Sequence, residues 1–501
     1  MAHRMSALSG GASGSSRGWH GHALYFAPGE SPGVNYGALS NAMHGHPTAR
    51  DRATLPPTAA LIVRQILMIV ALVLLTCATA LAAEGVWPRF RGPNGAGISP
   101  ATTVPVKWTE SDYNWKVTLP GPGHSSPILW GEKIFLTCAD PATAKRTILC
   151  LKAADGSVLW QRDYPSKTYA QHQDNCYAAS TPAADAENVY VTWSVPDEVI
   201  LLALDHAGAE KWRRNLGPIV AKHGSGTSPI VYEDMVVLAN DQEDLARMPF
   251  AGRGAGKSFI VAVGRTTGET RWQLDRRTAL AAYSTPCVYQ PEGGPPELIF
   301  TSTAHGITAV DPRTGKVNWE MEKVFIDRCV GSPVCAPGLV IASYGYGVRG
   351  SLLVAVRPGS REKNVEPQLA WDMKKSVPLV PAPVVKDGRL FCWADDGMVT
   401  CLNVATGEKV WGERVGGQFY GSPVWAAGRL YAIAKNGDVV VIAAADKYEP
   451  LARMPLGEPS FSTPAIAGGV MYLRTATHLI SVGGKEVAGE CRVGAPHPQV
   501  S

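Results

Sequence analysis

The stretch Ala309–Trp319 reads AVDPRTGKVNW and combines an apolar strand, a turn and the start of a second strand. Ala309, Asp311, Gly315 and Trp319 mark its frame. Related copies of the same phrase close at other tryptophans, namely Trp160, Trp212, Trp272, Trp371 and Trp411. A strand-turn-strand phrase that recurs along a chain predicts a repeat architecture, in which each copy belongs to one structural module.

A second repeated element of the sequence gives the number of modules. A proline that follows a small residue recurs at Pro127, Pro182, Pro229, Pro286, Pro333, Pro383, Pro423 and Pro464. The spacing runs from 40 residues (Pro383 to Pro423) to 57 residues (Pro229 to Pro286). Each proline precedes an apolar strand, a glycine-containing turn and further strands, which is the alternation of a four-stranded antiparallel blade. The sequence therefore predicts an all-β fold, an eight-bladed β-propeller.

The last two units are atypical. The eighth runs out of strands after LISVG, whereas YNWKVTLPG around Trp115 lies upstream of the first unit and reads as a blade end without a blade. We expect this N-terminal strand to complete the eighth blade, because pairing the two ends of the chain closes the ring and removes two exposed edges. The seventh unit ends in LARMPL without a tryptophan. Its strands are well formed and Asn436-Gly437 is a hairpin turn signal, so it counts as a full blade.

The repeated residue types have physical roles. Glycine in the turn adopts φ > 0 without steric cost. Proline lacks a ladder donor and suits the first position of a strand. A tryptophan can bury its ring between neighbouring blades while its indole N–H finds a carbonyl partner. The predicted docking residues are Trp115, Trp160, Trp212, Trp272, Trp319, Trp371 and Trp411.

These copies resemble the tryptophan-docking motif of PQQ-like (pyrroloquinoline-quinone-like) propellers. That superfamily includes the quinoprotein alcohol dehydrogenases and the propeller lipoprotein of the outer-membrane β-barrel assembly machinery. The opening WPRFRGPNGAGIS, Trp87–Ser99, resembles the start of mature secreted propellers of planctomycete-type bacteria. The resemblance covers Trp87 to Gly484. It implies the fold and says little about function, because the motif residues are packing residues.

The N-terminal region indicates export. Residues 1–60 are rich in Gly, Ser, His and Ala and cannot bury much apolar surface, so we interpret them as a disordered or mis-annotated extension. Residues 61–83 resemble a secretory signal cleaved after Ala82 or Ala83. An uncleaved membrane helix is the alternative. We expect a lead-in segment over 84–114, the propeller over 115–484 and a tail over 485–501, in the periplasm or cell envelope of a Gram-negative-type bacterium.

The overall charge restricts the partners. The formal net charge is +4 over 501 residues, and no basic helix or aromatic RNA-binding signature is present, so nucleic acid is not expected as a partner. Membrane contact is expected only through an uncleaved N-terminal helix. We expect a monomer or a component of a complex, with a protein or a cell-envelope polymer as its partner.

A binding site is expected at the axis of the ring, where the loops that enter each innermost strand converge. Three residues before the prolines stand His124, Ala179, Gly226, Tyr283, Val330, Val380, Tyr420 and Phe461. Such groups could form a polar funnel with aromatic walls, suited to a sugar, a peptide or a flat cofactor. The alternative is that the polar groups only cap loop backbone. The predicted funnel residues are His124, His172, Asn175, Tyr177, His223, Tyr283, Asp327, Arg328, Tyr420 and Phe461.

The sequence does not predict catalytic chemistry. No acid, base and nucleophile are fixed within mutual reach, so no catalytic residue is assigned. The resemblance to quinoproteins would imply a vicinal disulfide, a calcium site and an Asp base, yet the chain has no adjacent cysteines. We therefore expect no cofactor and no metal; PQQ with calcium is expected only if the chain is a dehydrogenase. AGRGAGKS, residues 251–258, matches a relaxed phosphate-loop pattern but precedes a predicted strand instead of a helix.

The cysteines favour packing roles, with one exception. Cys150 and Cys401 occupy the slot that alanine holds in other copies, which indicates small buried residues. In FCWADDGMVTC a two-residue turn at Asp396-Gly397 would place Cys392 directly opposite Cys401. This pairing raises the possibility of a disulfide, and two buried thiols are the alternative.

Three function classes follow. The preferred class is an exported, non-catalytic propeller that acts as a binding scaffold for a protein or an envelope polymer. The second is a PQQ-dependent dehydrogenase. The third is a carbohydrate-binding or carbohydrate-active propeller, in which Tyr283 and Tyr420 would contact the sugar.

Overall fold

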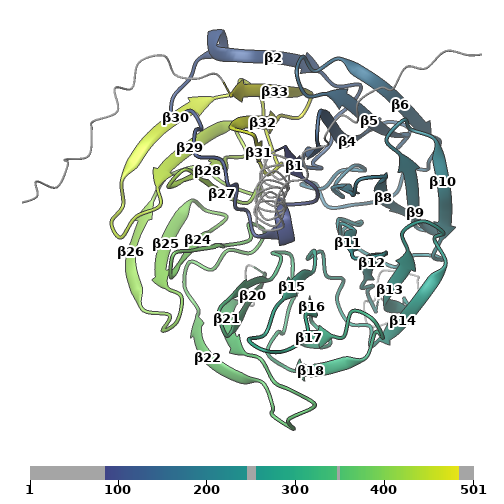
Figure 1. The fold of residues 1–501 in the computed structure, drawn as a ribbon, viewed down its shortest axis with the longest axis vertical. Helices are drawn as coiled ribbons and strands as arrows, with labels where there is room; N and C mark the ends of the chain where they lie inside the picture. Colours follow the sequence, from purple (N-terminus) through teal and green to yellow (C-terminus); the bar gives the residue numbers. More distant parts are fainter. Residues whose placement is uncertain (1–84, 245–255, 347–349, 485–501) are drawn as a thin grey trace, which may run out of the picture. The chain divides into compact units, whose positions relative to one another are not determined.

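The computed structural model describes residues 85–244, 256–346 and 350–484. All of them belong to one compact unit, Ile69–Ser501. They form eight antiparallel sheets arranged in a ring around an axis (Figure 1). The predicted all-β, eight-bladed propeller is confirmed, and the atypical seventh unit is a full blade. The predictions for residues 1–60, 61–83 and 485–501 lie outside the described residues.

Each blade is a meander of four strands whose first strand lies nearest the axis (Figure 1). The two short 3-10 helices are η1 (Pro93–Gly95) and η2 (Glu110–Asp112). The strands, blade by blade from blade 1 to blade 8, are β3 (Ile128–Trp130), β4 (Lys133–Ala139), β5 (Arg146–Lys152), β6 (Val158–Tyr164); β7 (Ala183–Ala184), β8 (Asn188–Val195), β9 (Glu198–Asp205), β10 (Glu210–Asn215); β11 (Ile230–Tyr232), β12 (Met235–Asn240), β13 (Ser258–Gly264), β14 (Thr270–Arg276); β15 (Cys287–Tyr289), β16 (Glu297–Ser302), β17 (Gly306–Val310), β18 (Val317–Met321); β19 (Val334–Ala336), β20 (Leu339–Tyr346), β21 (Gly350–Arg357), β22 (Gln368–Met373); β23 (Val384–Lys386), β24 (Arg389–Trp393), β25 (Met398–Asn403), β26 (Lys409–Arg414); β27 (Val424–Ala426), β28 (Arg429–Ile433), β29 (Asp438–Ala443), β30 (Pro450–Pro455); and β31 (Ala465–Ala467), β32 (Val470–Arg474), β33 (His478–Gly483), β2 (Tyr113–Thr118).

The N-terminal strand closes the ring as the sequence predicted. β2 pairs antiparallel with β33 and becomes the outermost strand of blade 8, with Trp115 opposite Ser481. The Trp115 ring also packs 6.0 Å from the ring of Tyr472 on β32. Because the two ends of the ring belong to one sheet, opening the ring requires breaking backbone hydrogen bonds of blade 8.

The repeated phrase places a small residue opposite each tryptophan. Ala309 faces Trp319 across the β17–β18 pair, and a register shift follows at once between Ala309 and Val310. Cys150 faces Trp160 and Cys401 faces Trp411 in the same way. Both cysteines are fully buried, so their predicted packing role is confirmed. The irregularity is a β-bulge, which increases the local twist and turns the aromatic side chain toward the neighbouring blade.

The turn of the phrase is held by its acidic residue. The Asp311 carboxylate accepts a hydrogen bond from the N–H of Arg313 at 2.8 Å, and the Asp311 carbonyl accepts one from Gly315 at 2.9 Å. Gly315 has φ = 70°, in the left-handed region that favours glycine. The turn glycine has a second role, because a Cβ at this position would lie 2.6 Å from the Trp272 ring of the preceding blade.

Tryptophan and glycine therefore interlock neighbouring blades. Trp160 of blade 1 donates its indole N–H to the His206 carbonyl in blade 2 at 3.0 Å, and its ring covers Gly208 in the same turn. This contact requires a glycine, because any side chain there would overlap the indole. The same N–H to carbonyl link to the next blade is made by Trp115 to Ala153, Trp212 to Arg265, Trp272 to Pro312, Trp371 to Val404 and Trp411 to Ala445.

Trp319 is different. Its indole N–H donates to the Glu297 carboxylate at 2.9 Å, and Glu297 lies on β16 of the same blade. In blade 5 the short glycine turn is replaced by the longer connection between Arg357 and Gln368, which joins β21 to β22. The interface of blades 4 and 5 is thus built differently from its neighbours.

The hydroxyl residue before each proline links the blades near the axis. The Thr181 hydroxyl in blade 2 accepts a hydrogen bond from the Ser126 N–H in blade 1 at 2.9 Å. At the closure of the ring, the Ser126 hydroxyl accepts from the Thr463 N–H of blade 8 at 3.1 Å. We call these residues the hydroxyl belt; its further links join Thr181 to Ser228, Thr285 to Ser332, Ala382 to Ser422 and Ser422 to Thr463. Ala382 has no hydroxyl, so it cannot accept from Ser332 in blade 5.

The lead-in segment crosses the ring. β1 (Val86–Trp87) pairs with β3 and gives blade 1 a fifth strand. Beyond it, Arg91 donates to the Pro383 carbonyl of blade 6 at 2.6 Å, and Ile98 forms a bridge to Trp425 on β27 of blade 7. Asn94 pairs with Val288 of blade 4 through both side-chain atoms, at 2.8 and 2.7 Å. Because these blades lie on different sides of the ring, the segment spans the axis at the level of the prolines.

The proposed pairing of Cys392 with Cys401 is wrong. Cys392 faces Thr400, and Cys401 faces Phe391. The turn has three residues instead of two, because Ala394 N–H donates to the Met398 carbonyl at 2.8 Å, and this moves the register by one. A shift of one residue sends the two side chains to opposite faces of the sheet. Each cysteine accordingly packs in a different hydrophobic cluster.

Two remaining features concern the chain outside the blades. Residues 241–257 separate β12 from β13, and Ser258 at the end of the phosphate-loop match begins a strand. The helix that phosphate binding requires does not follow it. Within the ranges that the structure describes, no helix is long and apolar enough to span a membrane.

Candidate functional site: the axial pocket

A cavity of about 350 Å³ lies on the axis of the ring. All eight residues that stand three positions before the prolines line it, from His124 in blade 1 to Phe461 in blade 8. The hydroxyl belt contributes Ser126, Thr181 and Thr463, among others. The lead-in segment adds Phe90. Since the lead-in crosses the axis at the level of the prolines and the entry loops precede them in the chain, the cavity lies between the lead-in and the entry loops.

The aromatic part of the wall is built by blades 7, 8 and 1. His124 stacks on Phe461 with ring centroids 4.4 Å apart and an interplanar angle of 17°, and Tyr420 meets Phe461 edge to face at 5.7 Å. Burial and the nearby Arg474 guanidinium lower the pKa of His124 to about 4. His124 is therefore neutral at physiological pH, and it acts as part of an aromatic wall rather than as a cation.

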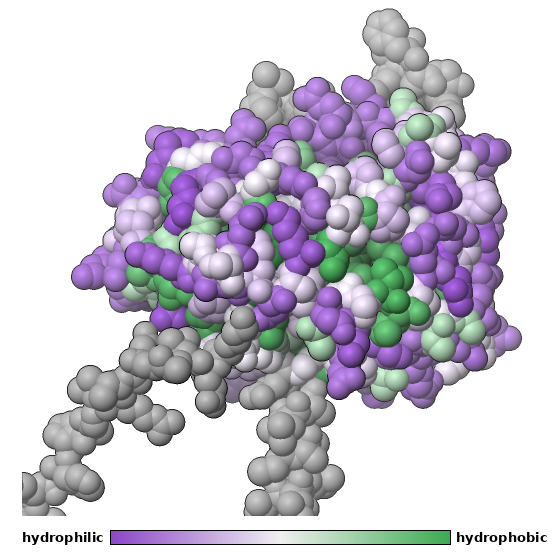
Figure 2. All heavy atoms as spheres, turned by 90° about the horizontal axis from the view of Figure 1, so that it is seen from above, coloured by the Kyte–Doolittle hydropathy of each residue, from purple (hydrophilic) through white to green (hydrophobic). Residues whose placement is uncertain are grey.

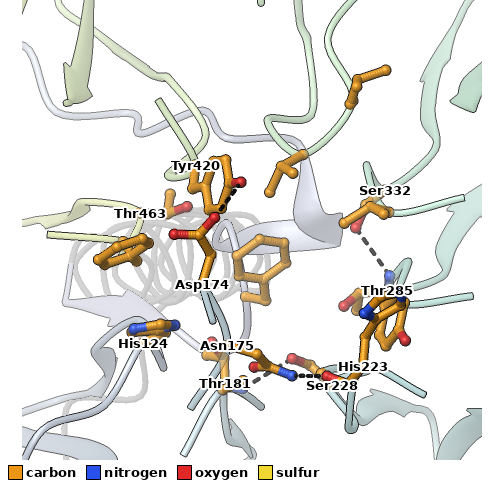
Figure 3. Close-up of a pocket in the computed structure, with 18 of the residues that line it drawn as sticks. His124, Asp174, Asn175, Thr181, His223, Ser228, Thr285, Ser332, Tyr420 and Thr463 are labelled. Atoms are coloured by element: carbon orange, nitrogen blue, oxygen red, sulfur yellow. Dashed lines mark hydrogen bonds between the residues drawn. The ribbon is translucent and has the colours of Figure 1, made fainter. Parts of the chain in front are cut away.

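One entry loop spans the pocket. Asp174, from the loop before blade 2, accepts a hydrogen bond from the Tyr420 hydroxyl of blade 7 at 3.0 Å (Figure 3). Its carboxylate also pairs with the Lys435 ammonium of blade 7 at 3.0 Å. Lys435 also lies over the Tyr420 ring, 4.4 Å from its centroid. Burial by itself would raise the pKa of Asp174, but the hydrogen bonds from Lys435 and Tyr420 outweigh it and lower that pKa. The Asp174 carboxylate is therefore ionised, and the Lys435 ammonium balances its charge.

The same loop is also held by contacts with the loop that enters blade 3. Asn175 donates its amide to the His223 and Ser225 carbonyls at 2.7 and 3.2 Å, and the rings of His172 and His223 meet edge to face at 5.2 Å (Figure 3). Burial and the Arg328 guanidinium lower the pKa of His223 to about 4. His223 is therefore neutral as well.

The charged groups of blades 3 and 5 are paired in the wall. Arg328 forms an ion pair with Glu243, whose side chain is fully buried. Glu243 also accepts a hydrogen bond from the Lys222 N–H. A buried carboxylate with these partners is satisfied, so this pair sets the shape of the wall and leaves little free charge toward the cavity.

Asp395 differs from Asp174, because backbone N–H groups and not a cation hold its carboxyl group. It lies in the turn between β24 and β25 and accepts the backbone N–H groups of Leu379 at 2.7 Å and Val380 at 3.3 Å. Burial nevertheless raises its pKa to about 6. Its carboxyl group therefore changes protonation state slightly below neutral pH, and it is held by backbone instead of by a cation.

Eight of the ten predicted funnel residues line the cavity: His124, His172, Asn175, His223, Tyr283, Arg328, Tyr420 and Phe461. Tyr177 does not line it; it bonds to Tyr169 at 3.0 Å and lies under the Arg146 guanidinium. Asp327 is buried and accepts the N–H of Arg328 at 2.8 Å. The predicted binding role of these residues remains a prediction.

Sequence reasoning did not assign Phe90, Asp174, Asp395 or Lys435 to the site. Asp174 stands beside the predicted Asn175 and could have been included on that ground. Asp395 and Lys435 occupy equivalent turns of blades 6 and 7, each ahead of a glycine in αL conformation, and a repeat alignment of these hairpins would have indicated their shared position. Phe90 carries no such signal, since nothing local places the lead-in at the axis.

The pocket does not fit a quinone with calcium. A calcium ion needs several free oxygen ligands. Here the Asp174 carboxylate is engaged by Lys435 and Tyr420, and that of Asp395 accepts backbone N–H groups. A separate group of His305, Glu320 and Glu322 lies on blade 4, away from the cavity, and Arg277 pairs with Glu322 at 2.7 Å.

Solved structures similar in fold include propellers of two kinds. BamB from Moraxella catarrhalis matches with a TM-score of 0.52 and 14% identity, covering 75% of this chain and 98% of that one. The quinohemoprotein alcohol dehydrogenase from Comamonas testosteroni matches with a TM-score of 0.55 and 12% identity, covering 84% of each chain. Identities this low show a shared fold and leave function open. No curated protein sequence matches this chain.

A family model matches this chain and shows its family. The model described as outer membrane protein assembly factor BamB matches residues 110–274, 144–371 and 367–449, which together span more than half of the 501 residues. Overlapping matches are expected where one repeat can align with several blades. The chain therefore belongs to the family of outer membrane protein assembly factor BamB and is a PQQ-like β-propeller repeat protein.

Proposed function

We propose that this chain is an exported, non-catalytic scaffold that binds a protein of the cell envelope through the face on which the axial pocket opens. The observation that carries the proposal is the state of the pocket's charged groups. Asp174 is neutralised by Lys435, Arg328 is paired with Glu243, and two of the histidines are neutral. Such a recess accommodates a projecting group but holds few free groups to do chemistry.

The family supports a protein as the partner. Its description names assembly of outer membrane protein, which is work on polypeptides. The entry loop of blade 5 offers an apolar contact: Ile326 is 58% exposed and stands two positions before the pocket residue Arg328. An exposed apolar side chain close to a recess with aromatic walls suits recognition of a polypeptide.

The outer surface is a less suitable alternative. In a side view it is mainly hydrophilic, with separate hydrophobic areas (Figure 2). Exposed apolar residues lie on outer strands far apart in the ring: Val158 and Leu159 are on β6 of blade 1, and Val410 is on β26 of blade 6. Scattered apolar residues of this kind are ordinary on a soluble protein surface and do not mark one binding site.

Site-specific photo-crosslinking in the native host tests the proposal. A photo-reactive phenylalanine analogue replaces Ile326 in the full chain, and the matched control carries it at Val410 on β26. We expect an ultraviolet-dependent adduct with an envelope protein at position 326, absent at position 410 and reduced by His172→Ala or Tyr420→Ala. Equal adducts at both positions, no adduct at 326, or an adduct removed by glycan-degrading enzymes would refute binding of a protein at this face.

A further inference from the structure

The interface between blades 4 and 5 lacks the tryptophan link that joins blades 3 and 4 and blades 5 and 6. Trp319 directs its N–H to Glu297 within blade 4 instead of to blade 5. The glycine turn that would receive its ring is replaced by the connection between β21 and β22. The hydroxyl belt still joins the two blades, because the Thr285 N–H donates to the Ser332 hydroxyl at 3.0 Å. A further contact between these blades would therefore have structural value.

Two thiols meet at this interface. Cys287 begins β15, the innermost strand of blade 4, and Cys335 lies in the middle of β19, the innermost strand of blade 5. Their sulfur atoms are 3.4 Å apart. A disulfide has an S–S length of about 2.05 Å, so each sulfur needs to move by less than about 1 Å to form the bond. Side-chain rotation about Cα–Cβ supplies movement of this size without displacing the strands.

Four other described cysteines have different surroundings. Cys329 is fully buried in the cluster that contains Cys287, and its carbonyl accepts the N–H of Tyr283. Cys138 contacts the Arg474 guanidinium at 3.4 Å, in blades 1 and 8. Cys392 and Cys401 point to opposite faces of blade 6. Geometry therefore singles out Cys287 and Cys335.

Exposure sets the order in which the two thiols can react. Cys287 is 2% exposed, and the lead-in segment covers its neighbours, because Arg89 donates to the Pro286 carbonyl and Asn94 pairs with Val288. Cys335 is only partly buried. An oxidant from solution therefore reaches Cys335 first, and Cys287 lies in position to resolve the product.

We propose that Cys287 and Cys335 form a disulfide that joins blades 4 and 5 when the folded chain meets a disulfide-bearing oxidant, such as an oxidised CxxC protein or oxidised glutathione. The Cys335 thiolate attacks the oxidant's disulfide, forms a mixed disulfide and releases one oxidant thiolate. The Cys287 thiolate then attacks the Cys335 sulfur, forms the interblade bond and releases the second oxidant thiolate. The two cysteines lose two protons and two electrons, and the oxidant's disulfide is reduced to two thiols.

The bond would replace the missing tryptophan contact. It closes a loop of 48 residues, and restricting the unfolded chain in this way stabilises the folded state more as the loop grows longer. The proposal is independent of any ligand in the axial pocket, so it can fail while the proposed function stands.

The test is mass spectrometry of the full chain after oxidation. The folded protein is incubated with oxidised glutathione, free thiols are then alkylated under denaturing conditions, and the protein is digested without reductant. We expect a peptide pair joined through Cys287 and Cys335, lost on addition of dithiothreitol. Complete alkylation of both thiols, or a bond from either cysteine to Cys329 instead, would overturn the proposal.

A second test compares the unfolding temperatures of the oxidised and reduced protein, with two cysteine variants as controls. Oxidised wild-type protein should unfold at a temperature higher than the reduced form by on the order of 5 °C. Cys335→Ser should abolish this difference, whereas Cys401→Ser, which removes a buried thiol in blade 6, should retain it. A redox-dependent shift that persists in Cys335→Ser would assign the effect to another pair. If Cys335→Ser fails to fold, the peptide mapping on the wild-type chain still decides.

Discussion

The interlock between tryptophan and glycine can be measured by comparing two glycine substitutions. Gly208 has φ = 82°, and an added Cβ would lie 2.7 Å from the Trp160 ring. Gly428 has φ = 75°, and an added Cβ would meet nothing within 4 Å. Both changes to alanine strain the backbone equally, but only Gly208→Ala also forces the indole out of its position. Gly428→Ala is therefore the matched control.

The expected magnitudes follow from these contacts. A left-handed conformation costs an L-alanine about 1–2 kcal/mol, partly offset by the lower entropy of the unfolded chain. Gly428→Ala should then lower the free energy of unfolding by about 1 kcal/mol. Displacing the packed Trp160 ring adds about 1–3 kcal/mol by overpacking, and shifting the indole weakens its 3.0 Å hydrogen bond to His206. Gly208→Ala should cost about 2–4 kcal/mol.

Urea unfolding monitored by tryptophan fluorescence and by circular dichroism measures both losses. A third variant, Trp160→Ala, removes the ring, and in that background Gly208→Ala should cost no more than Gly428→Ala does in the wild type. Equal losses for the two glycine variants in the wild-type background would refute the view that the turn glycine is required by the neighbouring indole. In that case the positive φ alone would account for it.

Three further outcomes are expected. Ala382→Ser should raise the free energy of unfolding by about 1 kcal/mol in urea titrations, because the new hydroxyl can accept from the Ser332 N–H and complete one link of the hydroxyl belt; unchanged or lowered stability would show that the geometry at this interface forbids the link. Burial raises the pKa of Asp395 to about 6 from an ordinary value of 3.8, so the folded state binds the carboxyl proton more tightly than the unfolded state does. The protonated carboxyl therefore stabilises the fold at low pH, and this stabilisation is lost as the pH rises from about 4 to about 6. Unfolding measured at pH 4 and pH 7 should show Asp395→Asn gaining stability relative to the wild type across that interval, by up to about 3 kcal/mol; a constant difference between the two proteins would contradict the burial argument. Asn94→Gly should destabilise the chain by about 1–2 kcal/mol and expose the lead-in to proteolysis, because glycine tolerates the φ of 50° at this position but removes both hydrogen bonds to Val288; an unchanged proteolysis rate would mean that these bonds do not hold the lead-in in place.

The sequence alone determined the features that depend on local repetition. A proline after a small residue recurs in all eight units and a tryptophan closes the first six, so blade number, strand direction and the small residue opposite each tryptophan could be predicted from period and residue type. The closure by Trp115 followed because a unit without its last strand and a strand without its unit can satisfy each other's backbone. The same frame placed His124, Tyr420 and Phe461 at the axis.

Only the tertiary structure decided the features that depend on contacts between distant segments. Asn94 meets Val288 across 194 residues, and Asp174 meets Lys435 across 261, distances at which no local pattern constrains the pairing. The register of Cys392 was missed because a hairpin loop of two residues and one of three are both compatible with Asp-Asp-Gly, and the difference of one residue reverses the face of every side chain. Likewise, the meeting of Cys287 and Cys335 depends on how two blades are rotated against each other, which the packing of whole sheets determines.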